Sequence, residues 1–430
     1  MSLSVVMKLL FFSSYYKPEL TSNNRISADT REGFVKRGHT IALFAPTPTR
    51  GVSKEVRREY KKRKRETEAD GAIEVRRFAL WGEGKNPALR ALRYLVMEAL
   101  FVWHGLWVKG VDMRVSGSTP PIHGLTAVAL KKLRGIPFMY YLADLFPESL
   151  VSTGMTKKGS LLWKIGSWVS NVTYRNASRI VVISDRLKSR LIEKGVPAEK
   201  IDVLYVWIDE NATKPIPREK NTVFDEFNLP RDKFYVTYAG NLGYSQNVEI
   251  LADCAAKLKD DPNIRFVVFG DGTQKESLQK KIESLGLDNF SVFPMQPVER
   301  VAEVYSVSDV SLVACRKGVG GGAFPSKAST IMATGTPVLV SYDDDSDLVD
   351  LVRASECGLC VEPENVEQTV DAIRKFYREP DFRKRCGENA RKVVCERFSK
   401  EKGVARYVEI CEQIAAENAQ KKEKSNGDAQ

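Results

Sequence analysis

The chain has 430 residues, 43% of them hydrophobic and 28% charged, and a formal net charge of +11. This length exceeds what one ordinary core accommodates and predicts two domains, while the composition excludes a disordered chain. The basic excess favours an anionic partner, which leaves nucleic acid, a phosphorylated substrate or an acidic membrane surface. No nucleic-acid-binding motif accompanies the charge, so we expect no nucleic acid partner.

The chain begins with a short apolar run, Val5–Phe12. It has no basic leader and no small-residue cleavage site, and therefore predicts a buried first strand rather than a signal peptide. No run reaches the length of a membrane-spanning helix. The seven cysteines, all in the second half, fit free thiols of a reducing compartment. We expect a cytoplasmic protein, with contact at the inner face of the plasma membrane.

The first half alternates short apolar runs with longer helical periods, which is typical of βαβ units and a parallel sheet. We expect strands at Val5–Phe12, Thr40–Ala45, Ile73–Phe78, Met113–Ser116, Pro137–Tyr141 and Arg179–Ile183. Helices are expected at Ile26–Arg37, Leu92–Val108, Leu125–Leu133 and Leu161–Tyr174.

The second half repeats this rhythm after a polar, proline-bearing segment, Trp207–Asp232, which predicts a linker and re-entry segment. Strands are expected at Tyr235–Tyr238, Arg265–Phe269, Ser291–Phe293, Val310–Ala314 and Pro337–Ser341. From Val366 the pattern is helical. The predicted domains are 1–206, 207–395, a C-terminal helix at 396–418 that packs back on the first domain, and a disordered tail at 419–430.

The strongest chemical signal is the glycine-rich segment Lys317–Lys327, directly after the strand that ends at Ala314. Glycines there let the backbone approach a ligand, and Pro325 fits the first turn of a helix that runs through Met332. The N-terminus of that helix and the charge of Lys327 predict a diphosphate site. The alternative is a flexible surface loop that enters a buried helix.

Two more glycine turns follow strands, at Gly240–Gly243 and at Gly270–Gly272. Such strand–turn–helix junctions direct backbone donors at a phosphate. Neither turn has the full dinucleotide spacing, and we expect a structural role for Asp271.

These motifs resemble those of family 4 glycosyltransferases, which have the GT-B fold. The resemblance covers residues 7 to about 415 and includes Tyr16–Glu19, Phe34–His39, Asp144–Ser149, Gly240–Gly243, Gly270–Gly272, Phe324–Lys327 and Met332–Val338. Asp144–Ser149 and the Pro-Ser-Lys loop are similar to the fucosaminyltransferase-type subgroup of bacterial surface-polysaccharide synthesis. The expected fold class is therefore α/β, with two Rossmann-like, doubly wound domains facing across a cleft and C-terminal helices.

The resemblance implies a retaining, metal-independent hexosyltransferase that has no cofactor and uses a UDP-sugar as donor. The sugar is expected to be an N-acetylated hexosamine or a deoxy-hexosamine, passed to a lipid-linked or polysaccharide acceptor. The residues implied in donor binding are Gly240, Asn241, Gly243, Gln246, Gly270, Gly272, Met295, Gly321, Gly322, Phe324, Pro325, Ser326 and Thr330.

Catalytic roles are expected for Lys327, for Asp144, which ends an apolar strand abruptly, and for Glu148. Arg25 and His123 are candidates for acceptor binding. For Asp144, a loop salt bridge is an equally good interpretation, and for Arg25 a solvated first helical turn is.

The chain also departs from the family pattern. Asn241 and Gln246 stand where the family has an arginine and a lysine, and Gly322 and Thr330 stand where it has two glutamates. The family's histidine in the first domain falls on Ala143. These losses leave open the alternative that the protein is a catalytically inactive partner that binds nucleotide sugar. An epimerase or a phosphorylase is disfavoured, because the sequence lacks the residues that either would need.

A basic segment, Lys54–Glu66, precedes an aromatic, apolar helix at Leu92–Val108. This composition favours contact with a membrane surface. The alternative is a solvated basic loop beside a helix whose aromatic side chains belong to the core.

Overall fold

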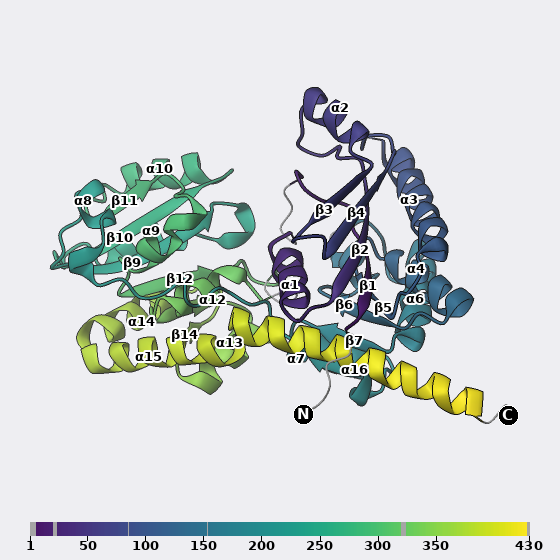
Figure 1. The fold of residues 1–430 in the computed structure, drawn as a ribbon. Helices are drawn as coiled ribbons and strands as arrows, with labels where there is room; N and C mark the ends of the chain where they lie inside the picture. The colour runs from purple at the N-terminus through teal and green to yellow at the C-terminus, as the bar shows by residue number, and fades with distance from the viewer. Residues whose placement is uncertain (1–5, 20–23, 85, 153, 320–323, 428–430) are drawn as a thin grey trace. The chain divides into compact units, whose positions relative to one another are not determined.

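The structure, a computed structural model, describes residues 6–19, 24–84, 86–152, 154–319 and 324–427. The chain forms two compact units (Figure 1). Unit 1 comprises Met1–Tyr205 and Lys402–Gln430, and unit 2 comprises Val206–Glu401.

Unit 1 contains an eight-stranded sheet of order β3-β4-β2-β1-β5-β6-β7-β8. All neighbouring strands pair in parallel except β3, which is antiparallel to β4. The strands are β1 (Lys8–Phe12), β2 (Thr40–Pro46), β3 (Arg65–Glu68), β4 (Ile73–Phe78), β5 (Met113–Gly117), β6 (Phe138–Leu142), β7 (Arg179–Val182) and β8 (Ile201–Val203).

Helices cover both faces of this sheet: α3, α4 and α6 lie on one face, and α1 and α16 lie on the other (Figure 1). The helices of unit 1 are α1 (Asn24–Lys36), α2 (Lys54–Lys62), α3 (Pro87–Trp107), α4 (His123–Arg134), α5 (Glu148–Ser152), α6 (Leu161–Asn176), α7 (Asp185–Glu193), the short η1 (Ala198–Lys200) and α16 (Lys400–Gly427).

Unit 2 contains a six-stranded, wholly parallel sheet of order β11-β10-β9-β12-β13-β14. Its strands are β9 (Phe234–Asn241), β10 (Ile264–Asp271), β11 (Phe290–Phe293), β12 (Val310–Ala314), β13 (Val338–Ser341) and β14 (Gly358–Val361). Its helices are η2 (Arg218–Lys220), α8 (Val223–Glu226), η3 (Tyr244–Gln246), α9 (Ile250–Lys257), α10 (Lys275–Ser284), η4 (Val298–Arg300), α11 (Val301–Tyr305), α12 (Ser326–Ala333), α13 (Asp347–Ser355), α14 (Val366–Arg378) and α15 (Pro380–Arg397).

The expected strands all occur, within a few residues of their predicted ends, and most of them are buried apolar runs between helices. Three strands were not predicted. The edge strand β3 is charged throughout, β8 has only three residues, and β14 lies in a segment that showed little beyond its Cys-x-x-Cys spacing.

The segment Trp207–Asp232, expected as a linker and re-entry segment at the start of the predicted domain 207–395, folds onto unit 2. Trp207 is 2% exposed, and the backbone oxygens of Glu210 and Thr213 accept hydrogen bonds from Arg391 at 2.7 and 2.9 Å. Prolines and polar residues made the segment look like a connection, although most of its large apolar side chains are buried.

The prediction of disorder from residue 419 is wrong as far as Gly427, where α16 ends. The stretch from Ala419 to Lys424 consists of good helix formers, and extending an existing helix costs much less than starting one. The N-terminal part of α16 packs on unit 1: Phe34 lies edge-on to Tyr407 at 6.2 Å, and Arg37 pairs with Glu412 at 2.7 Å.

Candidate functional site

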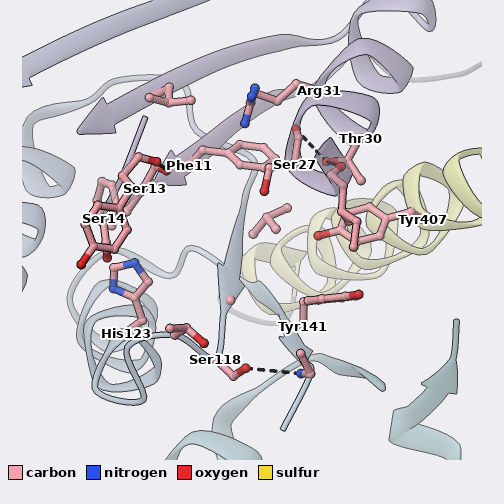
Figure 2. Close-up of a pocket in the computed structure, with 18 of the residues that line it drawn as sticks. Phe11, Ser13, Ser14, Ser27, Thr30, Arg31, Ser118, His123, Tyr141 and Tyr407 are labelled. Carbon is pink, nitrogen blue, oxygen red and sulfur yellow. Dashed lines mark hydrogen bonds between the residues drawn. The ribbon is translucent and has the colours of Figure 1, made fainter. Parts of the chain in front are cut away.

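Unit 1 contains a cavity of about 250 Å³ at the carboxyl ends of β1, β5 and β6. Strand order reverses between β1 and β5, and ligands of open α/β sheets bind at such a switch point. Figure 2 shows Ser13 and Ser14 entering from the end of β1, Thr30 and Arg31 from α1, and Tyr407 from α16. Ser118 and His123 line the cavity from the loop after β5 and the start of α4.

The polar lining of this cavity is cationic and rich in hydroxyl groups. Arg31, 7% exposed, lies over the Tyr16 ring at 5.0 Å, and Arg50 lies over the Tyr15 ring at 5.3 Å. The hydroxyl of Ser14 is buried without a hydrogen-bond partner. Among the described residues that line the cavity there is no aspartate or glutamate. Such a lining suits an anionic ligand.

A buried glutamate holds the loop that carries Arg50. Glu19 is 2% exposed, and its Oε1 accepts hydrogen bonds from the backbone N–H groups of Thr49 and Arg50, both at 2.7 Å. The loops after β1 and β2 are therefore fixed to each other, which gives Arg50 a defined position at the cavity.

His123 lies at the cavity, where the sequence placed it among the acceptor-binding candidates. It is 3% exposed, and its Nδ1 lies 2.5 Å from Glu98 Oε1. Thr126 donates a second hydrogen bond to Glu98 at 2.6 Å. Although burial alone would raise the pKa of the Glu98 carboxyl, the His123 and Thr126 contacts outweigh it and lower that pKa. The histidine thus has a fixed orientation beside the cavity.

The two acidic candidates of unit 1 differ in environment. Asp144 follows β6 and comes directly after Ala143, which lines the cavity. The Ala143 N–H donates to Ser118 Oγ at 3.3 Å. Partial desolvation raises the pKa of the Asp144 carboxyl. Glu148 begins α5 and pairs with Lys194, while its second oxygen is buried without a partner. The ion pair indicates a structural contribution for Glu148.

Arg25 lies in the first turn of α1, and its side chain is outside the described residues. Sequence reasoning missed Arg31 and Arg50. Arg31 lies on the helix face that carries Ser27 and Thr30, and Arg50 follows the end of β2. The helical period and the strand end were signals that could have identified both arginines.

In unit 2, the predicted donor-binding turns meet where β9 and β10 end. Leu242 N–H donates to Asp271 O, and Gln274 N–H donates to Leu242 O, both at 2.8 Å. A Cβ on Gly270 would lie 2.5 Å from Gly240 O, and one on Gly272 would lie 2.6 Å from Leu242 O. Close backbone packing therefore explains these glycines whether or not a ligand binds.

Lys327 lies in the first turn of α12 and reaches the end of β9. Its Nζ donates to Tyr238 OH at 2.5 Å, lies 4.0 Å from the centroid of that ring, and would be 3.7 Å from a Cβ on Gly240. Burial lowers the pKa of the Lys327 ammonium to about 8. Within the described part of the chain no carboxylate pairs with it. An uncompensated cation at a helix N-terminus is suited to bind an anion.

The helix that carries Lys327 begins one residue later than predicted. Pro325 is the N-cap of α12, which runs from Ser326 to Ala333, and no side chain of a described residue caps it. Phe324 lies 5.1 Å from the Phe398 ring, and Thr330 Oγ1 donates to Ser326 O at 3.2 Å. Gly321 and Gly322 lie outside the described residues.

Four other donor-binding candidates lie at or after the ends of β9 and β11. Asn241 is exposed, and a Cβ on Gly243 would lie 2.8 Å from its Nδ2 and 2.6 Å from Gln246 Oε1. The Gln246 oxygen is buried and has no hydrogen-bond partner. Met295 follows β11 and is 48% exposed. The structure brings Asn241, Gly243 and Gln246 together and places Met295 two strands away from β9.

Arg316, a further cation near this turn, is already paired. It contacts Glu364 at 3.1 Å and Glu249 at 3.9 Å, and lies 4.1 Å from the Tyr244 ring centroid. Its charge is therefore largely offset, which leaves Lys327 as the stronger anion-binding candidate.

Over the ranges that the structure describes, no helix is long and apolar enough to cross a membrane, and no group of histidine, cysteine and carboxylate side chains is arranged to hold a metal ion.

Comparisons with known proteins match both halves of the chain. Residues 24–207 match the family described as "Glycosyl transferase 4-like domain", and residues 219–393 match "Glycosyl transferases group 1". A putative colanic acid biosynthesis glycosyl transferase of Escherichia coli (strain K12) is 25% identical over 376 residues, which cover 86% of this chain and 92% of that relative.

Solved structures are similar over nearly the whole chain. Sucrose-phosphate synthase from Thermosynechococcus elongatus has a TM-score of 0.71 at 17% identity, covering 95% of this chain and 99% of that one. Anabaena HepE in complex with UDP has a TM-score of 0.69 at 17% identity, covering 95% and 100%. The predicted fold class, two Rossmann-like domains of the GT-B type, is confirmed. The chain is therefore a glycosyltransferase, with a glycosyl transferase 4-like domain in its first half and a group 1 domain in its second.

Proposed function

We propose that this glycosyltransferase moves an N-acetylated hexosamine or deoxy-hexosamine from a UDP-sugar to a lipid-linked or polysaccharide acceptor in cell-surface glycan synthesis. The observation that carries the proposal is the ammonium of Lys327 at the N-terminus of α12, beside the turn after β9, where no described side chain caps the helix or pairs with the charge. The UDP bound in the structurally similar HepE and the colanic acid role in the name of the E. coli relative support the choice of donor and pathway.

Strand order in unit 2 reverses between β9 and β12, so the turn after β9 and the segment after β12 flank the switch point. A diphosphate bound there would pair with the Lys327 ammonium and accept hydrogen bonds from the backbone N–H groups of the first turn of α12. When the bond between the anomeric carbon and the diphosphate oxygen breaks, its electron pair leaves with UDP. Stabilising that developing charge is the largest contribution a protein makes in such a transfer.

On the acceptor side we propose that the unit 1 cavity binds a phosphate-bearing acceptor through Arg31 and Arg50. The described residues that line it are rich in hydroxyl groups and include no carboxylate, which supports this choice. The acceptor hydroxyl forms the new bond to the anomeric carbon with retention, and its proton passes to a base. Asp144, with its raised carboxyl pKa, is the proposed base. The subgroup resemblance of the Asp144–Ser149 and Pro-Ser-Lys motifs is the basis for proposing a hexosamine.

The deciding experiment incubates the protein with a panel of UDP-sugars and a polyprenyl-diphosphate-linked acceptor. We expect UDP release with one amino sugar and, by NMR, the same anomeric configuration in product and donor. A donor at 100 times its dissociation constant should also stabilise the fold by about 2.7 kcal/mol. Donor binding without UDP release for any acceptor would contradict the proposal, and an inverted product would contradict its retaining mechanism.

A further inference from the structure

One face of unit 1 exposes an unusual amount of apolar surface. The helices α3, α4 and α6 lie side by side on this face of the sheet, because α4 packs against both of the others (Figure 1). Their solvent sides therefore form one continuous surface. We call it the α3–α6 face and define it by its exposed large apolar side chains: Leu89, Leu92, Leu95, Trp103, Trp107, Leu133, Leu161, Leu162, Ile165 and Trp168.

The apolar residues of α3 surround the helix. Met97 and Phe101 are fully buried against the sheet, while Trp103 and Trp107 on the opposite side are 58% and 68% exposed. From Ala91 to Trp107 the solvent side of α3 carries no charged residue, because Arg93 and Glu98 are buried. A helix whose outer side faces only water normally carries polar residues there. The apolar outer side of α3 therefore indicates contact with an apolar neighbour.

The outer side of α6 has the same character. Leu161 is 75% exposed, and Ile165 and Trp168, four and seven residues later, are 51% and 58% exposed, which places all three on one side of the helix. In the loop just before α6, Met155 is 71% exposed. Apolar exposure over neighbouring helices on this scale marks an interaction surface rather than scattered single residues.

Charge identifies the neighbour. The sequences of α3, α4 and α6 contain a single acidic residue, the buried Glu98. Their basic residues that are not buried, with those that flank them, are Arg90, Lys109, Lys131, Lys132, Arg134, Lys157, Lys158, Lys164 and Arg175. Apolar and tryptophan side chains beside lysines and arginines are the composition of surfaces that bind anionic lipid headgroups.

We propose that the α3–α6 face docks this protein on an anionic lipid bilayer, with the tryptophans and leucines of α3 and α6 inserted at the headgroup level. A second copy of the chain suits the face less well. In a twofold dimer the same patch faces itself, so the lysines around Lys157 would lie against their equivalents. The inference concerns a surface and does not depend on which sugar or acceptor the enzyme uses.

Vesicle flotation without any substrate tests the proposal separately from the transfer reaction. We expect the full chain to float with vesicles of phosphatidylcholine containing phosphatidylglycerol, to bind weakly to pure phosphatidylcholine, and to release at high salt. The double variants Trp103→Ser/Trp107→Ser on α3 and Leu161→Ser/Trp168→Ser on α6 should each lower the partition coefficient by tenfold or more. All four side chains are exposed, so unchanged thermal unfolding is the accompanying control.

Matched variants on unit 2 control for lost hydrophobicity and lost charge in general. Val298→Ser removes an apolar side chain that is 71% exposed, and should leave flotation unchanged. Lys157→Gln/Lys158→Gln/Lys164→Gln should weaken binding about fivefold per lysine, since each contributes attraction to an anionic surface. Lys384→Gln, a lysine of unit 2 with a side chain 77% exposed, should have no such effect.

Flotation that is equal for the wild type and the α3 and α6 variants would overturn the proposal. So would an absence of flotation together with a concentration-dependent dimer, detected by sedimentation, that the Trp103→Ser/Trp107→Ser variant abolishes. Quenching of tryptophan fluorescence by lipids brominated near the headgroups should occur in the wild type and decrease in that variant, which separates insertion from adsorption by charge alone.

Discussion

At the scale of single residues, Lys327 concentrates the chemistry of unit 2. Asn241 and Gln246 are neutral, although family 4 glycosyltransferases have an arginine and a lysine at these positions. Arg316 is paired with Glu249 and Glu364. We therefore expect Lys327→Ala to lower turnover by about 10²-fold or more, the usual loss when one such stabilising group is removed. Steady-state UDP release measures it, with Lys384→Ala, an exposed lysine elsewhere on unit 2, as the control. Unchanged kinetics in Lys327→Ala would disprove the role.

The environment of Lys327 also predicts how donor binding depends on pH. Burial lowers its pKa to about 8 in the free protein, and a bound diphosphate favours the charged form, so binding takes up a proton where the amine is neutral. The dissociation constant of the UDP-sugar should be flat below pH 7 and rise above pH 8, by up to about tenfold per unit. Calorimetric titrations of wild type and Lys327→Gln check this, and the variant should show no such rise.

In unit 1 the positive charge at the cavity comes from arginines, of which Arg50 is the one suited to mutation. Arg50 is exposed, with its guanidinium over Tyr15, so Arg50→Ala should leave the fold intact. Losing a hydrogen bond to a charged acceptor phosphate should raise the acceptor KM by roughly tenfold or more and leave donor affinity unchanged. Arg58→Ala, an exposed arginine of α2, is the control. An equal effect of the two substitutions would remove Arg50 from the acceptor site.

At the scale of elements, the junction of β9 and β10 links packing to function. The carbonyl of Gly240 leaves no room for a side chain on Gly270, whereas a Cβ on Gly84 would have no neighbour closer than 4.0 Å. Overpacking of this kind costs about 1–3 kcal/mol, so Gly270→Ala should destabilise the junction and Gly84→Ala should not. Hydrogen exchange followed by mass spectrometry on β9 and β10 peptides measures it. Normal protection in Gly270→Ala would show that the backbone relaxes at no cost.

Hydrophobic periodicity predicted most elements because it reports burial, and most of the strands it identified are buried runs. It failed where burial is not carried by a run of apolar residues. Arg65–Glu68 forms an edge strand through backbone pairing with β4 and through ion pairs of Glu66 and Glu68. Trp207–Asp232 is held in part by hydrogen bonds from Arg391. Periodicity identified α3 but not how exposed its aromatic residues are: Phe101 is core, whereas Trp103 and Trp107 are at the surface.

The candidate site was predictable to the extent that it depends on strand ends. Lys327 and the glycine turns follow apolar strands, so their positions in sequence place them at the carboxyl edge of a sheet. Partners distant in sequence were not predictable, because no local pattern encodes them. The contact of Lys327 with Tyr238 and the pairing of Glu148 with Lys194 arise from tertiary packing and change how each charge is interpreted.

At the scale of the whole molecule, the chain returns to its first unit after completing the second. Helix α16 buries Val408, Ile410 and Ile414 in unit 1, Cys411 Sγ lies 3.8 Å from Met139 Sδ, and Tyr407 lines the cavity. Residues 402–427 thus belong structurally to the domain that the chain left at Tyr205.

Truncation tests this dependence. A chain that ends after Ser399 loses the burial of three large aliphatic side chains, about 5 kcal/mol, and leaves the surface around Phe34 uncovered. We expect unit 1 to unfold at a much lower temperature and to be cleaved rapidly by protease, while unit 2 keeps its donor-induced thermal shift. A chain that ends after Asn418 retains every buried position of α16 and should melt like the full chain. If both truncations melted alike, α16 would be dispensable for unit 1.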